Sequence, residues 1–173
     1  MVKSYVLMNC EPNSEKDCIA TLKKIPGVRE AHGTLGLYDI IAQIELDTDK
    51  EIQDTTGNIR KMPKIRSTMT LTRSESGELF QPSEKLIGAM LGQNLVKSYI
   101  VIHCDKGEEY PILKDLSHIP EVKEADVIFG LYDVICKVES SSNEILDNVI
   151  TKAIRKIPHI VSSMTLNVIP EQS

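Results

Sequence analysis

The tetrapeptide Gly-Leu-Tyr-Asp occurs twice in this sequence, at 36–39 and at 130–133. Its aspartate can accept hydrogen bonds or pair with a cation. Its glycine, which has no side chain, lets backbone N–H groups approach an anion closely. A small binding site needs only a few polar groups of this kind that point to one place. The two tetrapeptides are therefore the first candidates for a binding site.

The same residues also have a purely structural interpretation. A glycine between two predicted strands is typical of a turn with positive φ, and an aspartate in such a turn often accepts backbone N–H bonds. Tyr38 and Tyr132 would then pack in a core or in an interface. The sequence alone leaves both interpretations open.

Residue types that carry enzymatic chemistry are not arranged here as a catalytic set. An enzyme needs a positioned acid, base or nucleophile, and the duplicated residues include no histidine and no Cys–His couple. The cysteines form no C-x-x-C pair, and those that recur lie in apolar runs, where a thiol is usually inert. We therefore expect no catalytic residue, no metal site and no cofactor. The four cysteines are Cys10, Cys18, Cys104 and Cys136.

An internal duplication explains why the tetrapeptide occurs twice. Residues 2–5 (Val-Lys-Ser-Tyr) recur at 96–99, an offset of 94, and the same offset carries Cys10 onto Cys104. From Ile59 onward the offset is 95, so the second copy holds one more residue, in or before its second helix. Two copies are too few for a solenoid, and the sequence therefore predicts two similar domains.

Each copy predicts the same six elements. In the first copy they are a strand (4–10), a helix (14–25), a strand from 28 to a turn at Gly36, a strand (38–45), a second helix that ends before Pro63, and a strand (65–72). The order β-α-β-β-α-β is the ferredoxin-like plan. We expect an α+β protein with domains at 1–72 and 96–173, joined by a linker over 73–95 that could hold a short helix.

Strand composition predicts how the two domains pack. Helices cover only one face of a ferredoxin-like sheet, and the other face should be polar if it meets water. Residues 6–8 and 100–102 are apolar throughout, so both faces of each first strand are apolar. We expect the two domains to pack sheet on sheet as a pseudo-dimeric α+β barrel. The alternative is that each domain pairs with another chain.

Composition excludes several classes of partner. The chain has 173 residues and a net charge of −5, which argues against direct nucleic-acid binding because phosphates require clustered basic residues. Aromatic residues make up only 4%, too few for base-stacking platforms. No apolar run approaches the roughly 20 residues of a membrane span. We expect a cytoplasmic protein that does not contact membranes.

The ordered set of residues resembles the effector-binding domain of the Lrp/AsnC transcription regulators, also called the RAM domain. The first copy matches through Val28, Gly36, Tyr38, Asp39, Pro63, Ile65, Thr68 and Thr70. The second copy matches through Val122, Gly130, Tyr132, Asp133, Pro158, Ile160, Ser163 and Thr165, departing only at Ser163, which keeps the hydroxyl and loses a methyl. We expect a tandem RAM protein that lacks the family's helix-turn-helix.

The resemblance implies a non-enzymatic protein that senses an amino acid or a related metabolite and forms oligomers. A free amino acid carries an ammonium, which Asp39 or Asp133 could bind, and a carboxylate, which turn N–H groups could bind. The ligand-binding residues that the resemblance implies are Gly36, Tyr38, Asp39, Thr68, Thr70, Gly130, Tyr132, Asp133, Ser163 and Thr165.

Two alternative functions stay open. In the first, the protein co-assembles with full-length Lrp/AsnC regulators and modulates them. In the second, it is a small enzyme of the dimeric α+β barrel type, which would need a deep pocket that places His32 or His103 beside a second titratable group.

Overall fold

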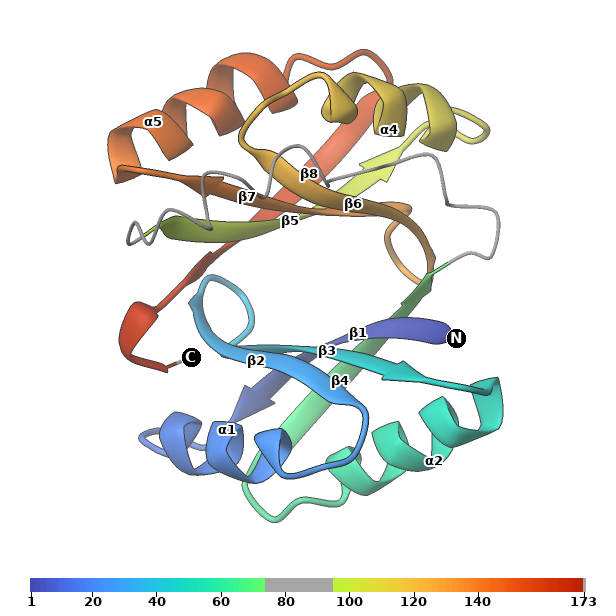
Figure 1. Ribbon diagram of the computed structural model, residues 1–173, viewed down its shortest axis with the longest axis vertical. Helices are drawn as coiled ribbons and strands as arrows, with labels where there is room; N and C mark the ends of the chain where they lie inside the picture. The colour runs from blue at the N-terminus through green and yellow to red at the C-terminus, as the bar shows by residue number, and fades with distance from the viewer. Residues whose placement is uncertain (74–94, 173) are drawn as a thin grey trace. The chain divides into compact units, whose positions relative to one another are not determined.

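The computed structural model describes residues 1–73 and 95–172, which form two compact units (Figure 1). Of the described residues, 1–73 and 166–172 belong to unit 1, and 95–165 belong to unit 2. The linker and short helix expected at 73–95 lie outside the described residues, apart from the two ends of that segment.

Unit 1 contains a four-stranded antiparallel sheet with both helices on one face (Figure 1). The central strand β1 pairs with β3 on one side and with β4 on the other, while β2 pairs with β3. The elements in chain order are β1 (Val2–Cys10), α1 (Glu15–Lys23), β2 (Val28–Leu35), β3 (Ile40–Leu46), α2 (Asp49–Arg60) and β4 (Ile65–Arg73).

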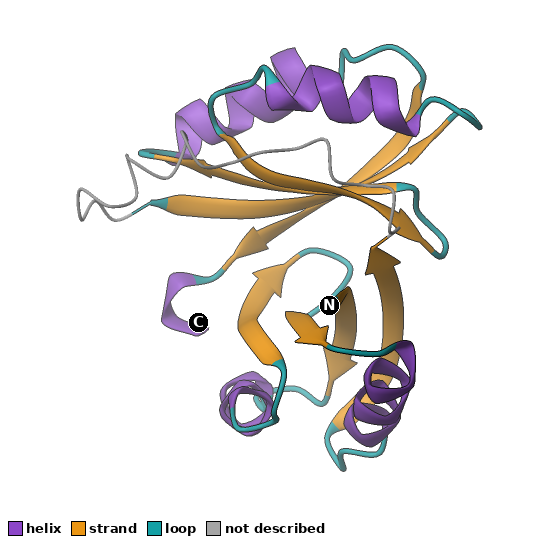
Figure 2. Cartoon of the chain, turned by 45° about the vertical axis from the view of Figure 1, so that its right-hand side comes forward, coloured by secondary structure: helices purple, strands orange, loops and turns teal. Residues whose placement is uncertain are grey.

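Unit 2 repeats this order, and its central strand β5 lies between β7 and β8. Both helices again lie on one face of the sheet (Figure 2). The elements are β5 (Val96–Cys104), α4 (Glu109–Ser117), β6 (Val122–Phe129), β7 (Val134–Ser140), α5 (Asn143–Asn148), a π-helical segment η2 (Val149–Ile154), β8 (Ile160–Val168) and a 3₁₀ turn η3 (Pro170–Gln172). The last residues of β8 belong to unit 1, where Thr34 pairs with Val168.

The helix-covered face of each sheet holds the hydrophobic core. In unit 1, Val6 and Met8 of β1 belong to one buried cluster with Leu22 of α1 and with Ile52 and Ile59 of α2. Unit 2 has the corresponding cluster around Ile100, Ile102, Leu113, Leu116, Leu146 and Ile154. Each fully buried side chain of this size contributes about 1.5–3 kcal/mol to stability. The predicted fold class, two tandem ferredoxin-like βαββαβ domains, is confirmed.

The helix-free faces of the central strands are buried as well, as the apolar runs predict. Tyr5 and Leu7 of β1 are 2% and 0% exposed, and Tyr99 and Val101 of β5 are 1% and 0% exposed. These faces also carry buried polar groups that the sequence analysis did not anticipate. The Lys3 ammonium lies 5.2 Å from the centre of the Tyr5 ring, in cation–π contact.

The one-residue difference between the copies appears as a wide helical turn. The second helix of each copy begins after equivalent caps, Thr48 and Ser142, at an offset of 94. At Ile154, which matches Ile59, the offset is 95. Between these points, Val149–Ile154 is π-helical, and the Arg155 N–H donates to Ile150 O. The wider turn absorbs the extra residue and keeps Ile154 buried in the core.

Helix α2 is better defined than its Thr55-Thr56-Gly57 segment predicts. Thr48 and Glu51 form a reciprocal capping box, in which each side chain accepts a bond from the other residue's backbone N–H. Such a cap stabilises a helix by about 1 kcal/mol, which offsets the glycine in the helix interior.

Replacing Gly57 by Ala should raise the free energy of unfolding by about 0.5–1 kcal/mol, because Ala is the better helix former and an added Cβ meets no atom within 4 Å. Gly107 is the matched control: its site is equally open but has a φ of +89°, so Gly107→Ala should destabilise the protein. Urea denaturation of both variants measures the difference. Equal effects of the two substitutions would contradict this explanation of α2.

Candidate functional site

The two tetrapeptides form the connections β2–β3 and β6–β7, as expected for turns. Gly36 has a φ of 150° and Gly130 a φ of 141°, a backbone region that other residues rarely adopt. Both glycines are exposed, while the tyrosine and aspartate of each turn are half-buried. The structural role expected of the glycines is therefore present in both units.

Each turn aspartate ties its turn to the end of the central strand. The Cys10 N–H donates to Asp39 Oδ2 at 3.0 Å, and the Asp39 N–H donates to Met8 O at 2.9 Å. In unit 2 the Cys104 N–H donates to Asp133 Oδ2 at 2.9 Å, with the same main-chain bond to Ile102 O. An ionised carboxylate that accepts a backbone N–H forms a strong hydrogen bond. Both aspartates therefore help to hold the turns in place.

The electrostatic surroundings of the two carboxylates differ. His103 Nδ1 lies 2.8 Å from Asp133 Oδ2, so the imidazole shares the oxygen that accepts the Cys104 N–H. The equivalent residue in unit 1 is Asn9, which cannot carry a charge and donates to Ser67 Oγ at 3.3 Å. Asp133 therefore has an imidazole beside its carboxylate, and the position equivalent to that imidazole is an amide in unit 1.

The tyrosine of the first turn packs beside β4. Tyr38 OH contacts Met69 Sδ at 3.8 Å, and its carbonyl accepts a bond from Thr34 Oγ1 at 2.8 Å. Tyr132 is half-buried at the matching position of unit 2. These contacts fit the packing interpretation of the tyrosines and leave part of each ring accessible.

The predicted hydroxyl groups lie on the far side of the central strand from the turn. Thr68 and Thr70 of β4 pair with Met8 and Val6 of β1. Because Met8 and Val6 belong to the core under the helices, both threonines lie on the helix-covered face of the sheet. β1 separates them from β3 and its turn. With strands about 4.8 Å apart, that separation is about 10 Å. The five predicted residues of unit 1 therefore form two groups, and β5 separates β7 from β8 in the same way in unit 2.

The two threonine groups differ in hydrogen bonding. Thr68 Oγ1 accepts a bond from Arg60 Nε at 3.3 Å. The Oγ1 atoms of Thr70 and of its repeat equivalent Thr165 are fully buried and have no hydrogen-bond partner among the described residues. Ser163 is half-buried. No contact in the described residues brings these hydroxyls to the turn aspartates.

Exposed apolar side chains flank both turn glycines, a feature that the sequence analysis missed. Leu35 and Leu37 are 64% and 74% exposed beside Gly36, and Phe129 and Leu131 are 66% and 76% exposed beside Gly130. Large apolar side chains exposed side by side mark interaction surfaces more often than scattered ones do. The tips of both hairpins are therefore candidate contact surfaces.

Three of the four thiols are unsuited to nucleophilic chemistry near neutral pH. Burial raises the pKa of Cys10 to about 11 and the pKa values of Cys104 and Cys136 to about 12, and at Cys104 the nearby Asp133 carboxylate adds to the effect. A thiol of this kind stays protonated, and the thiolate is the reactive form. Within the residues that the structure describes, no three His, Cys, Asp or Glu side chains cluster as metal ligands would.

Comparisons with known proteins agree with the duplicated architecture. A profile of the Lrp/AsnC ligand binding domain matches residues 3–76 and again residues 97–171. The chain belongs to this family. It carries the ligand-binding domain twice, as the resemblance of the ordered residues implies, and that recognition is confirmed.

Two solved structures of about half this length align closely in sequence. The hypothetical protein PHS023 from Pyrococcus horikoshii is 37% identical over 43% of this chain and 90% of its own, with a TM-score of 0.41. The protein FFRP-DM1 is 40% identical over 43% of this chain and 99% of its own, with a TM-score of 0.42. Among curated proteins, none matches this Lrp/AsnC-family chain.

A third structure shares the fold over nearly the whole chain. The siroheme decarboxylase NirDL aligns with 96% of this chain and 70% of its own at a TM-score of 0.71, with only 6% identity. At that identity the similarity shows the fold alone. Among the described residues, no helix has the length and apolarity that crossing a membrane requires.

The raised thiol pKa values predict how stability depends on pH. Around neutral pH these three thiols are protonated in both the folded and the unfolded chain and contribute no pH dependence. Above the ordinary thiol pKa of 9.0 the unfolded chain loses protons that the folded chain retains, so the free energy of unfolding should fall as the pH rises towards 11–12.

Urea denaturation between about pH 7 and pH 10.5 measures this fall. Cys136→Ala is the matched variant, because it removes one of the buried thiols and should flatten the slope. An identical slope in the variant and the parent protein would show that other groups cause the pH dependence.

Proposed function

We propose that this protein is a non-enzymatic regulator that binds an amino acid or a related small metabolite. The observation that carries the proposal is the match of both halves to one ligand-binding domain. In each half the Gly-Leu-Tyr-Asp turn presents a carboxylate and exposed backbone beside a half-buried tyrosine. That combination offers charge, N–H donors and an apolar surface to a ligand that carries an ammonium and a carboxylate.

We assign the stronger of the two turn sites to unit 1. Asp133 lies 2.8 Å from His103 Nδ1, and the residue equivalent to His103 in unit 1 is the uncharged Asn9. A ligand ammonium would compete with this imidazole for Asp133 and would meet no such competitor at Asp39. The turns of the two copies would then differ in affinity, although their tetrapeptides are identical.

Isothermal titration calorimetry with the twenty common amino acids, each tested to about 10 mM, examines the proposal. Asp39→Asn, which keeps the shape of the side chain and removes its charge, should weaken binding by about tenfold, because an ion-paired hydrogen bond is lost. Asp133→Asn is the matched control and should change the affinity by less than about threefold. Normal binding by both variants would place the site away from the turns.

The hairpin tips support self-association as part of the same proposal. Leu37 and Leu131 are the most exposed of the four apolar side chains beside the turn glycines, and a second copy of the chain would remove them from water. A full-length regulator of the Lrp/AsnC family would present a related surface, which is the specific reason to retain co-assembly as the second candidate function.

The double substitution Leu37→Glu and Leu131→Glu should reduce self-association, because charged tips repel one another and resist burial. Light scattering coupled to size-exclusion chromatography gives the mass of each variant. Val161→Glu is the matched control, since Val161 is also exposed (60%) and lies on β8 rather than at a tip. If the tip variant keeps the parent mass, the tips do not hold the oligomer together.

A further inference from the structure

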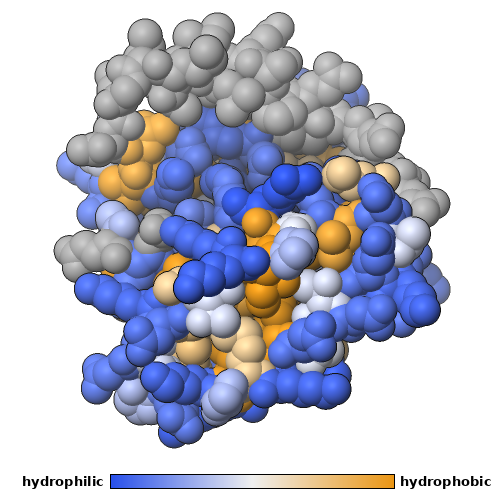
Figure 3. Space-filling model, turned by 60° about the horizontal axis from the view of Figure 1, so that its bottom comes forward, coloured by the Kyte–Doolittle hydropathy of each residue, from blue (hydrophilic) through white to orange (hydrophobic). Residues whose placement is uncertain are grey.

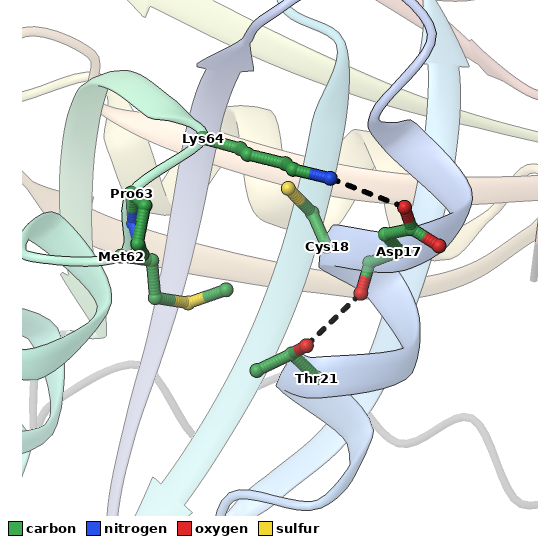
Figure 4. Close-up of a pocket in the computed structure, with 6 residues that line it drawn as sticks. All are labelled: Asp17, Cys18, Thr21, Met62, Pro63 and Lys64. Atoms are coloured by element: carbon green, nitrogen blue, oxygen red, sulfur yellow. Dashed lines mark hydrogen bonds and ion pairs between the residues drawn. The ribbon is translucent and has the colours of Figure 1, made fainter.

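Unit 1 contains a cavity of about 210 Å³ between helix α1 and the connection from α2 to β4 (Figure 4). It shares no residue with the turn described above. Six residues line it: Asp17, Cys18, Thr21, Met62, Pro63 and Lys64. Pockets for drug-sized ligands measure roughly 300–1,000 Å³, so this cavity suits a smaller molecule of about ten non-hydrogen atoms.

The walls of the cavity are apolar and contain two sulfur atoms. The Met62 side chain extends towards α1 from one side, and Cys18 and Thr21 project from α1 on the other (Figure 4). Cys18 is only 2% exposed and forms part of the inner surface. A methionine side chain adapts its shape to different apolar partners. These walls would accept an aliphatic or thioether side chain.

The rim carries one positive and one negative charge. Lys64 Nζ lies 3.2 Å from Asp17 Oδ2, and the Lys64 side chain crosses in front of Cys18 to reach α1 (Figure 4). Both side chains are well exposed, at 50% for Lys64 and 76% for Asp17. Exposed pairs of this kind contribute little to stability, so separating the two charges costs little.

Hydrogen bonds to main-chain oxygens fix the backbone on both sides of the cavity. The Glu11 N–H donates to Lys64 O at 2.9 Å, and the Ile65 N–H donates to Met62 O at 3.1 Å. On the opposite wall Thr21 Oγ1 donates to Asp17 O at 3.0 Å, within the helix. Because both walls are fixed through backbone atoms, a ligand would pay little to order them.

We propose that this cavity binds a free α-amino acid with an apolar side chain. The ligand ammonium replaces Lys64 as the partner of Asp17, its carboxylate replaces Asp17 as the partner of Lys64, and its side chain lies between Met62 and Cys18. A zwitterion matches the two opposite charges on the rim. A molecule with only one charge would satisfy one of them and leave the other without its present partner.

Unit 2 provides an internal comparison, because the repeat does not preserve this arrangement. The residues at the positions of Asp17 and Lys64 are Pro111 and His159. His159 has a φ of 72°, and its Nδ1 lies 3.2 Å from Asp105 Oδ2, before α4 rather than on it. The pair of opposite charges beside an apolar cavity therefore belongs to unit 1, and we expect one such site per chain.

Nuclear magnetic resonance of the full chain with ¹³C-labelled methionine methyls tests the proposal locally. The Met62 methyl, assigned through Met62→Leu, should shift saturably when unlabelled L-leucine is added to about 10 mM. Asp17→Asn and Lys64→Gln should each weaken this titration by about tenfold. 4-Methylpentanoate, which is leucine without the ammonium, and isoamylamine, which is leucine without the carboxylate, should bind more weakly than leucine by a similar factor.

Controls separate this site from the turn. Asp105→Asn with His159→Gln removes the corresponding ion pair of unit 2 and should leave the Met62 titration unchanged, as should Asp39→Asn. An unmoved Met62 methyl, or Lys64→Gln titrating like the parent protein, overturns the inference. If calorimetry still detects leucine binding that depends on Asp39, the proposed function stands without this site. If the Met62 methyl shifts and Asp39→Asn changes no affinity measured by calorimetry, the cavity is supported and the turn is rejected as a binding site.

Discussion

Burial of the central strand on both faces is the constraint on which each unit depends. β1 lies between two partner strands, its helix side holds Val6 and Met8, and its other side holds Tyr5 and Leu7, all at most 2% exposed. A register shift of one residue would exchange the two faces. The turn aspartates fix the end of these strands, since Asp39 and Asp133 accept N–H bonds from the last residue of β1 and β5. The turns are therefore positioned by the same strands that organise the core.

The two units have the same scaffold but differ in the charged residues on their surfaces. Both units have a turn whose aspartate accepts a backbone N–H from the central strand, exposed apolar residues beside the turn glycine, and a buried central strand. They differ in charge: His103 faces Asp133 where unit 1 has Asn9, and His159 pairs with Asp105 where unit 1 has the Lys64–Asp17 pair. In unit 2 histidines pair with both carboxylates, whereas in unit 1 the equivalent positions hold an asparagine and a lysine. The account therefore assigns ligand binding to unit 1 and a supporting role to unit 2.

Most of the fold could be predicted because it is encoded in local, repeated patterns. The apolar runs and the Gly-Leu-Tyr-Asp turns occur twice, and each occurrence supports the prediction made from the other. The π-helical turn at Val149–Ile154 could be located only as a change of offset, since sequence does not say how a helix accommodates an extra residue. The capping box of α2 could be predicted, because Thr48 and Glu51 have the required spacing. Gly57, a poor helix former, weakened the prediction of the helix itself.

The site was less predictable, because it depends on which side of a strand each residue occupies. Thr68 and Thr70 face the helices through their register with Met8 and Val6, and that register depends on pairing between distant segments. The pocket between Met62 and Cys18 forms only because a helix and a connection that are 44 residues apart in the chain lie side by side. No local sequence motif predicts such a contact between distant segments. The His103–Asp133 contact was foreseeable only as two residues at the ends of neighbouring strands.

Hydrogen–deuterium exchange of the whole chain, with and without a saturating mixture of apolar amino acids, tests most directly whether unit 1 binds the ligand. The account predicts slower exchange in peptides that cover the β2–β3 turn, α1 and the α2–β4 connection, with the corresponding peptides of unit 2 unchanged. Slower exchange confined to unit 2, or no change in either unit, would contradict it.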